Sequence, residues 1–270
     1  MNKIRVGIIG CGVIGSALAK AIEKNFFGLA ELTAVNDLDK AKTIKLVSSL
    51  TGNPGVLSIE ELISASDLVI EAASKDISAD TAHKALSKGK NIMVMSVGGL
   101  VGREDVLRLA DQKSCRLYIP SGALCGLDGV KAASMGGVNS VTLTTRKPPL
   151  GLEGAPYVVK SKIDLNAIKQ ETVLFEGTVL EAVQGFPKNI NVAAALSLAG
   201  IGPVKTKVKI VTSPEYKSNS HEVKVQGEFG ILITKTENLP SPQNPKTSLL
   251  AVLSAIAALK QILEHTKIGT

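Results

Sequence analysis

Residues 4–15 read Ile-Arg-Val-Gly-Ile-Ile-Gly-Cys-Gly-Val-Ile-Gly, and this stretch decides the fold. An apolar strand pattern runs directly into the motif Gly10-x-Gly12-x-x-Gly15 and then into a helical pattern. Gly10 permits a tight turn, Gly12 has no Cβ to obstruct a pyrophosphate, and Gly15 lets the helix pack closely on the strand. The free N–H groups at the helix start favour an anion there. We therefore expect a dinucleotide to bind at Gly10, Gly12, Val13, Ile14 and Gly15.

A carboxylate follows the second strand pattern at the spacing that a dinucleotide site requires. Asp37 ends the stretch 31–37 and lies 22 positions after Gly15, where it would accept hydrogen bonds from the adenosine ribose. A glycine-rich turn without a ligand is the alternative, but it requires the strand, the glycines and the carboxylate to coincide by chance. Leu38 follows Asp37 in place of a basic residue, which favours NAD over NADP, although Lys40 and Lys42 leave NADP possible.

Length and composition exclude several other classes of protein. A chain of 270 residues favours two domains. No apolar run reaches the roughly 18 residues of a membrane span, and the N-terminus enters a strand, so we expect a cytoplasmic protein without membrane contact. The net charge of +7 is scattered, and only 3% of residues are aromatic, so we expect no nucleic-acid partner. Cys11, Cys115 and Cys125 lack metal spacing, so we expect reduced thiols and no metal.

The first 120 residues alternate between strand and helix patterns, which predicts a Rossmann-type, doubly wound parallel sheet. A helix is expected over 13–27, and further strands over 68–72, 92–95 and 116–119.

Beyond Pro120 the pattern changes to longer, alternating strands, which predicts a second α+β domain with a mostly antiparallel sheet. Its strands are expected at 141–146, 206–212, 222–226 and 230–235, and helices at 189–198 and 249–263, with Pro245 in the first turn of the last helix. We predict a dinucleotide-binding domain over residues 1–121 and a catalytic and oligomerisation domain over residues 122–244. The last stretch, 245–270, is expected to form a helix that packs back on the dinucleotide-binding domain.

Three histidines are available for acid–base chemistry: His83, His221 and His265. His83 and His265 lie among charged residues or in the tail, so we expect both to be solvated. His221 opens a strand of the second domain, where an imidazole with a pKa near neutrality could exchange a proton with a substrate. A structural histidine paired with a hydroxyl at a strand edge explains this position equally well.

Small and amide residues add candidate cofactor contacts. Ala72 and Ala73 end a strand at the ligand edge of the sheet, where they suit close passage of the cofactor or simple packing. Ala123 lies in a glycine-rich loop after the fifth strand, which could border the nicotinamide or act as a hinge. Asn189 could cap a helix or bind the nicotinamide carboxamide.

The whole chain resembles the archaeal-type L-aspartate dehydrogenases. The resemblance rests on the glycine motif and on more particular strings, namely Tyr-Ile-Pro-Ser-Gly-Ala (118–123), Thr-Thr-Arg-Lys-Pro-Pro (144–149), Phe-Pro-Lys-Asn-Ile-Asn-Val-Ala-Ala (186–194), Ser-His-Glu-Val (220–223) and Asn-Pro-Lys-Thr-Ser (244–248). Two positions depart from the family, because many relatives have Gln where this chain has Lys75 and a basic residue where it has Leu38.

The resemblance implies NAD- or NADP-dependent conversion of L-aspartate to iminoaspartate, or to oxaloacetate and ammonia, in the supply of NAD biosynthesis. It implies that His221 is catalytic, that Ala123 and Asn189 contact the cofactor, and that the protein is a homodimer. Competing hypotheses are another two-domain dehydrogenase, such as a homoserine dehydrogenase or a dihydrodipicolinate reductase, and a non-catalytic NAD sensor. Solvated surface is the default for the cations that could bind the substrate carboxylates, Arg146, Lys147, Lys188 and Lys246.

Overall fold

The computed structural model describes residues 2–187 and 190–269. These residues form two compact units, which we describe separately. Unit 1 comprises residues 2–120 and 252–268, and unit 2 comprises residues 121–251 and 269 within the described ranges.

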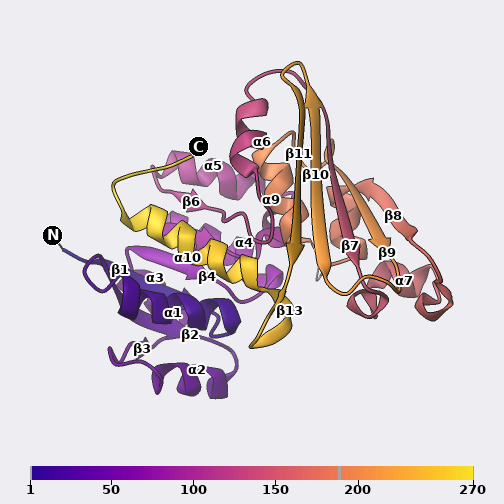
Figure 1. Cartoon of the computed structure of the whole chain (residues 1–270). Helices are drawn as coiled ribbons and strands as arrows, with labels where there is room; N and C mark the ends of the chain where they lie inside the picture. Colours follow the sequence, from indigo (N-terminus) through magenta and orange to yellow (C-terminus); the bar gives the residue numbers. More distant parts are fainter. Residues whose placement is uncertain (1, 188–189, 270) are drawn as a thin grey trace. The chain divides into compact units, whose positions relative to one another are not determined.

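Unit 1 is built on a six-stranded parallel sheet in the order β3-β2-β1-β4-β5-β6 (Figure 1). Its strands are β1 (Ile4–Ile9), β2 (Ala30–Asn36), β3 (Gly55–Val56), β4 (Leu68–Glu71), β5 (Asn91–Val94) and β6 (Leu117–Tyr118). The order reverses between β1 and β4, and ligands of such sheets bind at the carboxyl ends of the strands beside this reversal. The Rossmann-type prediction is confirmed.

Helices cover both faces of the unit 1 sheet, as parallel strands require. They are α1 (Val13–Asn25), α2 (Lys40–Val47), α3 (Ile59–Ala65), α4 (Lys75–Ser87), α5 (Glu104–Gln112), the short 3-10 helix η1 (Val97–Leu100) and most of α10 (Leu249–Leu263). Leu18 and Ile22 of α1 share one buried cluster with Ala255 and Leu259 of α10. The two helices therefore lie on the same face of the sheet (Figure 1).

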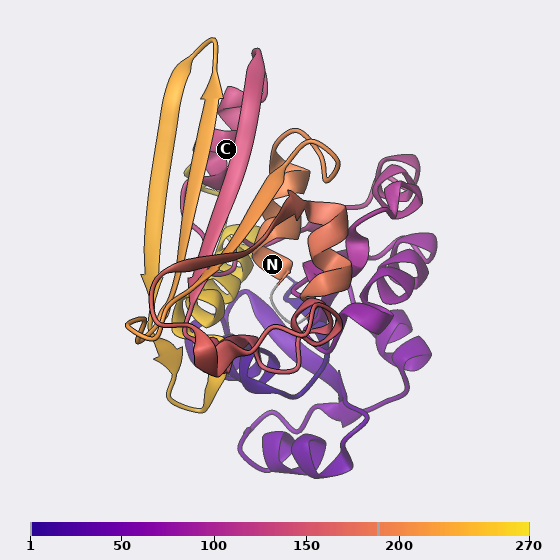
Figure 2. The ribbon, with the colours of Figure 1, turned by 90° about the vertical axis from the view of Figure 1, so that its right-hand side faces the viewer.

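Unit 2 contains a five-stranded sheet in the order β11-β10-β7-β9-β8. Its strands are β7 (Val138–Lys147), β8 (Thr172–Thr178), β9 (Lys207–Thr212), β10 (Asn219–Gly227) and β11 (Gly230–Asn238), and β12 (Pro240–Ser241) pairs separately with β13 (Asn244–Ser248). Figure 2 shows β7, β10 and β11 side by side. The mostly antiparallel prediction is confirmed, but β7 and β9 run parallel. These two strands are joined by a long crossover, and no hairpin forces them to be antiparallel.

The unit 2 sheet has a buried inner face and a more exposed outer face. Along β7, Val141, Leu143, Thr145 and Lys147 are buried, whereas the residues between them are partly exposed. The helical segments of this unit are α6 (Leu127–Ala133), α7 (Pro156–Lys160), α8 (Val179–Gly185), α9 (Asn191–Ala199), η2 (Pro149–Leu152) and η3 (Leu165–Ala167). The strand alternation thus decides which polar side chains enter the interior.

The last helix has the bounds that the sequence predicts, 249–263, but Pro245 is not in its first turn. Residues 244–248 form β13, and α10 starts at Leu249, so Pro245 belongs to a strand and not to a first helical turn. Pairing of β13 with β12 explains the difference, because a proline is tolerated in such an edge strand. Within the described ranges, no helix combines the length and apolarity that crossing a bilayer requires.

Candidate functional site

The loop between β1 and α1 is shaped by its glycines. Gly10 has a φ of +99°, and a Cβ built on it would lie 2.5 Å from the backbone carbonyl of Ala72. A Cβ on Gly15 would collide with the carbonyl oxygen of Gly10. The loop after β1 and the end of β4 are therefore in backbone contact at the carboxyl edge of the sheet, and a larger residue at Gly10 or Gly15 would separate them.

Gly12 behaves differently, because a Cβ built on it would meet no atom of the described chain within 4 Å. It is the N-cap of α1, whose first turn carries no acidic residue. The first N–H groups of a helix have no acceptor within the helix, and the helix dipole adds partial positive charge. Open space, free donors and no competing carboxylate together fit a pyrophosphate at this point.

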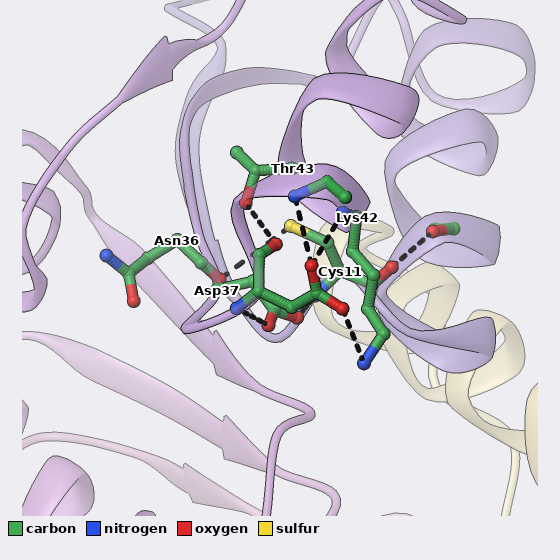
Figure 3. A network of polar contacts seen from close by, with 8 residues as sticks. Cys11, Asn36, Asp37, Lys42 and Thr43 are labelled. Carbon is green, nitrogen blue, oxygen red and sulfur yellow. Dashed lines mark hydrogen bonds and ion pairs between the residues drawn. The ribbon is translucent and has the colours of Figure 1, made fainter.

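Asp37 lies beside the glycine loop (Figure 3). Its Oδ2 accepts a 2.7 Å hydrogen bond from the N–H of Cys11, and its Oδ1 accepts a 2.8 Å bond from the N–H of Asp39. The N–H of Gly10 also donates to the carbonyl oxygen of Asn36 at 2.7 Å. Two backbone N–H groups, those of Gly10 and Cys11, thus join the glycine loop to the end of β2, and the Asp37 carboxylate is held where a ribose hydroxyl could also donate to it.

The charges after Asp37 do not form a basic pocket. Lys42 (Figure 3) pairs with Asp39 at 3.5 Å. Leu38 is 96% exposed. Cys11 is buried in the loop, and this burial raises the pKa of its thiol. A thiol in that state packs as a small apolar side chain.

Glu71 supports the opposite side of the same loop, a role that the sequence did not reveal. It is fully buried at the end of β4, and burial raises the pKa of its carboxyl. Oε1 accepts hydrogen bonds from the N–H groups of Ala73 (2.8 Å) and Ser74 (3.1 Å) and from the hydroxyl of Ser96 (2.9 Å). Oε2 accepts from the N–H of Ser96 at 3.1 Å. The carboxylate therefore joins the ends of β4 and β5 and shapes the turn at Ala72 and Ala73.

His221 is the third residue of β10 and lies on the inner face of the unit 2 sheet, 6% exposed. It pairs in register with Thr145 of β7, and Thr145 Oγ1 lies 3.0 Å from its Nδ1. Because the hydroxyl engages Nδ1, Nε2 is the ring nitrogen that remains to meet a reacting group. The hydroxyl partner suggested by the sequence is present, and the same geometry orients the ring as a catalytic imidazole requires.

The ionisation of His221 differs from the expectation of a near-neutral pKa, which is wrong for this chain. Burial, followed by the positive charge of Lys147, lowers the pKa of the imidazole to about 3. The ring is therefore neutral at physiological pH, which is the form that accepts a proton.

Lys147 is the second sequence expectation that the structure corrects. It is 8% exposed, not solvated, and burial lowers the pKa of its ammonium to about 8. Alternation along β7 puts it in the same phase as Val141 and Leu143, and this apolar phase was the signal that could have identified it. Arg146 points to the outer face, where it pairs with Glu222 at 3.2 Å.

Ala123 is fixed against β11 within unit 2. Its carbonyl oxygen accepts hydrogen bonds from Thr236 Oγ1 (2.9 Å) and Asn238 Nδ2 (3.3 Å). Thr236 is also the β11 partner of His221 in the sheet register. The structure thus connects the Ala123 loop to the His221 strand through one threonine, and Asn238 is a supporting residue that the sequence did not reveal.

The predicted site residues fall into two groups. Unit 1 brings together Gly10, Gly12, Val13, Ile14, Gly15, Asp37, Ala72 and Ala73 at the edge of its sheet. Unit 2 brings Ala123 close to His221. Asn189 and Lys188 lie outside the described residues. His83 and His265 are exposed. The described residues contain no group of three or more His, Cys, Asp or Glu side chains arranged to hold a metal.

Two family models match the chain, one in each half. The model described as homoserine dehydrogenase, NAD binding domain, matches residues 10–120, and the model described as aspartate dehydrogenase, C-terminal, matches residues 128–262. The matches therefore cover the glycine loop and the strand that carries His221.

Similar proteins extend over the whole chain. An L-aspartate dehydrogenase of Methanosarcina mazei is 51% identical over 99% of this chain and 100% of that protein. One from Bradyrhizobium diazoefficiens is 41% identical over 100% of this chain and 95% of its own length. A crystal structure of aspartate dehydrogenase from Thermotoga maritima superposes with a TM-score of 0.75 at 27% identity, covering 99% of this chain and 100% of that chain. A homoserine dehydrogenase structure from Thiobacillus denitrificans, at 11% identity and a TM-score of 0.64 over 97% of this chain and 74% of its own, shares the fold.

Proposed function

This chain belongs to the L-aspartate dehydrogenase family, and we propose that it oxidises L-aspartate at Cα with NAD as the cofactor. The observation that carries the proposal is the neutral, buried imidazole of His221, held at Nδ1 by Thr145 in the half of the chain that matches the aspartate dehydrogenase model. An oxidoreductase that removes hydrogen from an amino acid needs such a proton acceptor beside the reacting carbon.

The cofactor would be held by the residues at the edge of the unit 1 sheet. The N-terminus of α1 and Gly12 fit the pyrophosphate, and Asp37 fits the adenosine ribose. When bound, the nicotinamide ring supplies the hydride acceptor. NAD is favoured over NADP, because a 2′-phosphate would meet the Asp37 carboxylate while Lys42 is paired with Asp39. Ala123 and Asn189 are the proposed contacts to the nicotinamide end.

His221 would move the protons of the reaction. The ammonium form of L-aspartate loses one proton and, with the two electrons of its Cα–H bond, one hydride, which leaves the iminium form of iminoaspartate. His221 Nε2 accepts the proton from the amino group while Thr145 Oγ1 holds Nδ1. After the imidazolium has released this proton to solvent, the same nitrogen takes a proton from the water that attacks the iminium carbon and returns it to the departing nitrogen. The net products are oxaloacetate, ammonium, the reduced cofactor and one proton.

The reactivity of iminoaspartate indicates which kind of reaction would use this product. Iminoaspartate hydrolyses readily, so a reaction that consumes it before hydrolysis would use this enzyme as its source. We propose NAD biosynthesis as that use, in a cytoplasmic enzyme.

We also propose a homodimer that forms through the outer face of the unit 2 sheet. Ile231 and Ile233 of β11 are each 62% exposed on that face, and burying such side chains in a second copy would stabilise a dimer.

The decisive experiment follows the formation of NADH at 340 nm with L-aspartate, L-glutamate, L-alanine and L-homoserine as separate substrates. The proposal expects turnover with L-aspartate that exceeds the other three by at least about 100-fold in kcat/KM. Preference for L-homoserine would instead support the homoserine dehydrogenase alternative. Binding of NAD without turnover of any of the four amino acids would support an NAD sensor. Repeating the assay with NADP tests the cofactor preference.

A further inference from the structure

One end of the inner face of the unit 2 sheet carries a cluster of polar side chains. Thr145 pairs with His221 across β7 and β10, and Lys147, two residues further along β7, pairs with Thr212 of β9. Residues paired in register, and those two apart on a strand, point to the same face. Thr145, Lys147, Thr212 and His221 therefore share this face, and each is less than one-tenth exposed.

The Lys147 side chain is held in place by its surroundings. A Cβ built on Gly151 of η2 would lie 3.8 Å from Lys147 Cβ and 3.9 Å from its Cδ, so the aliphatic stem lies along this glycine. The Lys147 carbonyl oxygen accepts a 2.8 Å hydrogen bond from Thr212 Oγ1. A surface lysine extends into water, but the Lys147 side chain packs against this glycine and is only 8% exposed, so it lies in the interior.

Diagonal neighbours on adjacent antiparallel strands lie within reach of long side chains, and Lys147 and His221 occupy such positions. The two side chains also interact electrostatically, since the positive charge of Lys147 adds to the effect of burial and lowers the pKa of His221. Burying an ammonium in the interior of a sheet lowers the stability of the fold. Buried ionisable groups with shifted pKa values concentrate at functional sites.

We propose that Lys147 binds a carboxylate of the substrate and so determines the preference for a dicarboxylic amino acid. The inference rests on the proposed function of His221. An ammonium next to the proton acceptor would hold the substrate anion by a charge-assisted hydrogen bond and place its amino group against the imidazole. It also keeps the imidazole neutral until the anion arrives, and the bound carboxylate then offsets the charge of Lys147, which makes His221 a stronger base.

The test replaces Lys147 by Met, which retains the length and apolar volume of the stem without the charge. Methionine fills the volume of the lysine stem without burying a charge, and a circular dichroism spectrum and melting curve check that the variant folds. The matched control is Lys160→Met, because Lys160 is exposed at the end of α7 and the change removes one positive charge from the same unit.

The first readout is the equilibrium binding of succinate, a dicarboxylate without an amino group, measured by calorimetry with and without NAD. Lys147→Met should weaken succinate binding about 10- to 100-fold and leave the affinity for NAD unchanged, whereas Lys160→Met should change neither. Unchanged succinate binding in Lys147→Met, or an equal loss in Lys160→Met, overturns the proposal. Because this readout needs no turnover, failure of the wild type to oxidise L-aspartate would count against the proposed function and not against Lys147.

The second readout is the pH dependence of the same binding. His221 of β10 is a titratable group that faces Lys147, and it is neutral above pH 3, whereas the sheet neighbours Thr145 and Thr212 on this face carry hydroxyls. The charged ammonium is the binding form, so wild-type succinate affinity should fall as the pH rises through about 8. Lys147→Arg should retain affinity and lose this decline, because a guanidinium stays charged over that range. A decline that persists in Lys147→Arg contradicts the assignment.

Discussion

In unit 1 the carboxylates at the sheet edge are engaged by backbone N–H groups, whereas in unit 2 the candidate groups are side chains of separate strands that contact one another. The Glu71 carboxylate shows the difference best. It is fully buried, and its two oxygens accept four hydrogen bonds, three of them from N–H groups. His221 is nearly as buried, yet the described hydrogen bond to its ring comes from Thr145 alone.

The comparison separates two uses of a buried ionisable group. A carboxylate with all its lone pairs engaged stabilises a loop and has little capacity for a ligand. An imidazole with one nitrogen oriented by a hydroxyl still has the other nitrogen for chemistry. We therefore expect substitutions in unit 1 to change cofactor affinity and substitutions in unit 2 to change turnover.

The largest effect is expected from His221→Ala and His221→Asn. Loss of a positioned acid or base typically costs about 10²- to 10⁴-fold, so kcat with L-aspartate should fall in that range while the Kd for NAD stays unchanged. Steady-state rates and fluorescence titration with NADH measure the two quantities. His83→Ala and His265→Ala serve as controls, since both side chains are exposed and should be nearly silent. Wild-type turnover in His221→Ala would remove the catalytic assignment.

Gly12→Val tests the unit 1 side of the comparison. The added side chain would enter the open space at the start of α1 that is proposed for the pyrophosphate. Loss of two hydrogen bonds to a charged group predicts at least about 100-fold weaker NAD binding. The circular dichroism spectrum and the melting temperature should match the wild type, because the new Cβ contacts nothing in the chain. A folded Gly12→Val variant with normal NAD affinity would show that the glycine motif is only a turn.

Asp37→Ala is expected to have an intermediate effect on cofactor choice. Losing the ribose hydrogen bonds to a carboxylate should weaken NAD binding by about 1.5 to 3 kcal/mol, while removal of the negative charge favours a 2′-phosphate. The ratio of the NADP and NAD dissociation constants, from parallel titrations, should therefore move toward one. Glu31→Ala is the matched control, because it removes an exposed carboxylate from the other end of the same strand, β2. Tighter binding of NADP than of NAD in the wild type would contradict the proposed role of Asp37.

The smallest of these effects is expected from Thr145→Val, which retains the shape of the side chain and removes the hydroxyl beside His221 Nδ1. Thr145 is a positioning residue, so kcat should fall about 10-fold with little change in the KM for NAD. Thr145→Ser restores the hydroxyl and should recover most of the rate, although it creates a small cavity. An equal loss of rate in both variants would indicate a packing role only.

Most of unit 1 could be predicted from the sequence, because its elements are local. The order of strands and helices and the requirement for glycine at Gly10 all depend on residues close together in the chain. The short strand Gly55–Val56 escaped prediction, since it has no periodic pattern of its own and pairs only through β2. The parallel pairing of β7 with β9 escaped for a similar reason, because a long crossover leaves strand direction undetermined by any turn.

By itself the sequence determined the dinucleotide motif and singled out His221, since both depend on residue type and spacing along one strand or loop. Only the tertiary structure decided the protonation state of His221 and the burial of Lys147. Thr145 and Lys147 are more than 70 residues from His221 in the chain, and sheet register brings them to its side. Burial then lowers the pKa of both basic groups, because an environment poor in water disfavours the charged form of each. The free energy needed to charge a buried group depends on how the whole unit packs around it, and no short stretch of sequence encodes that packing.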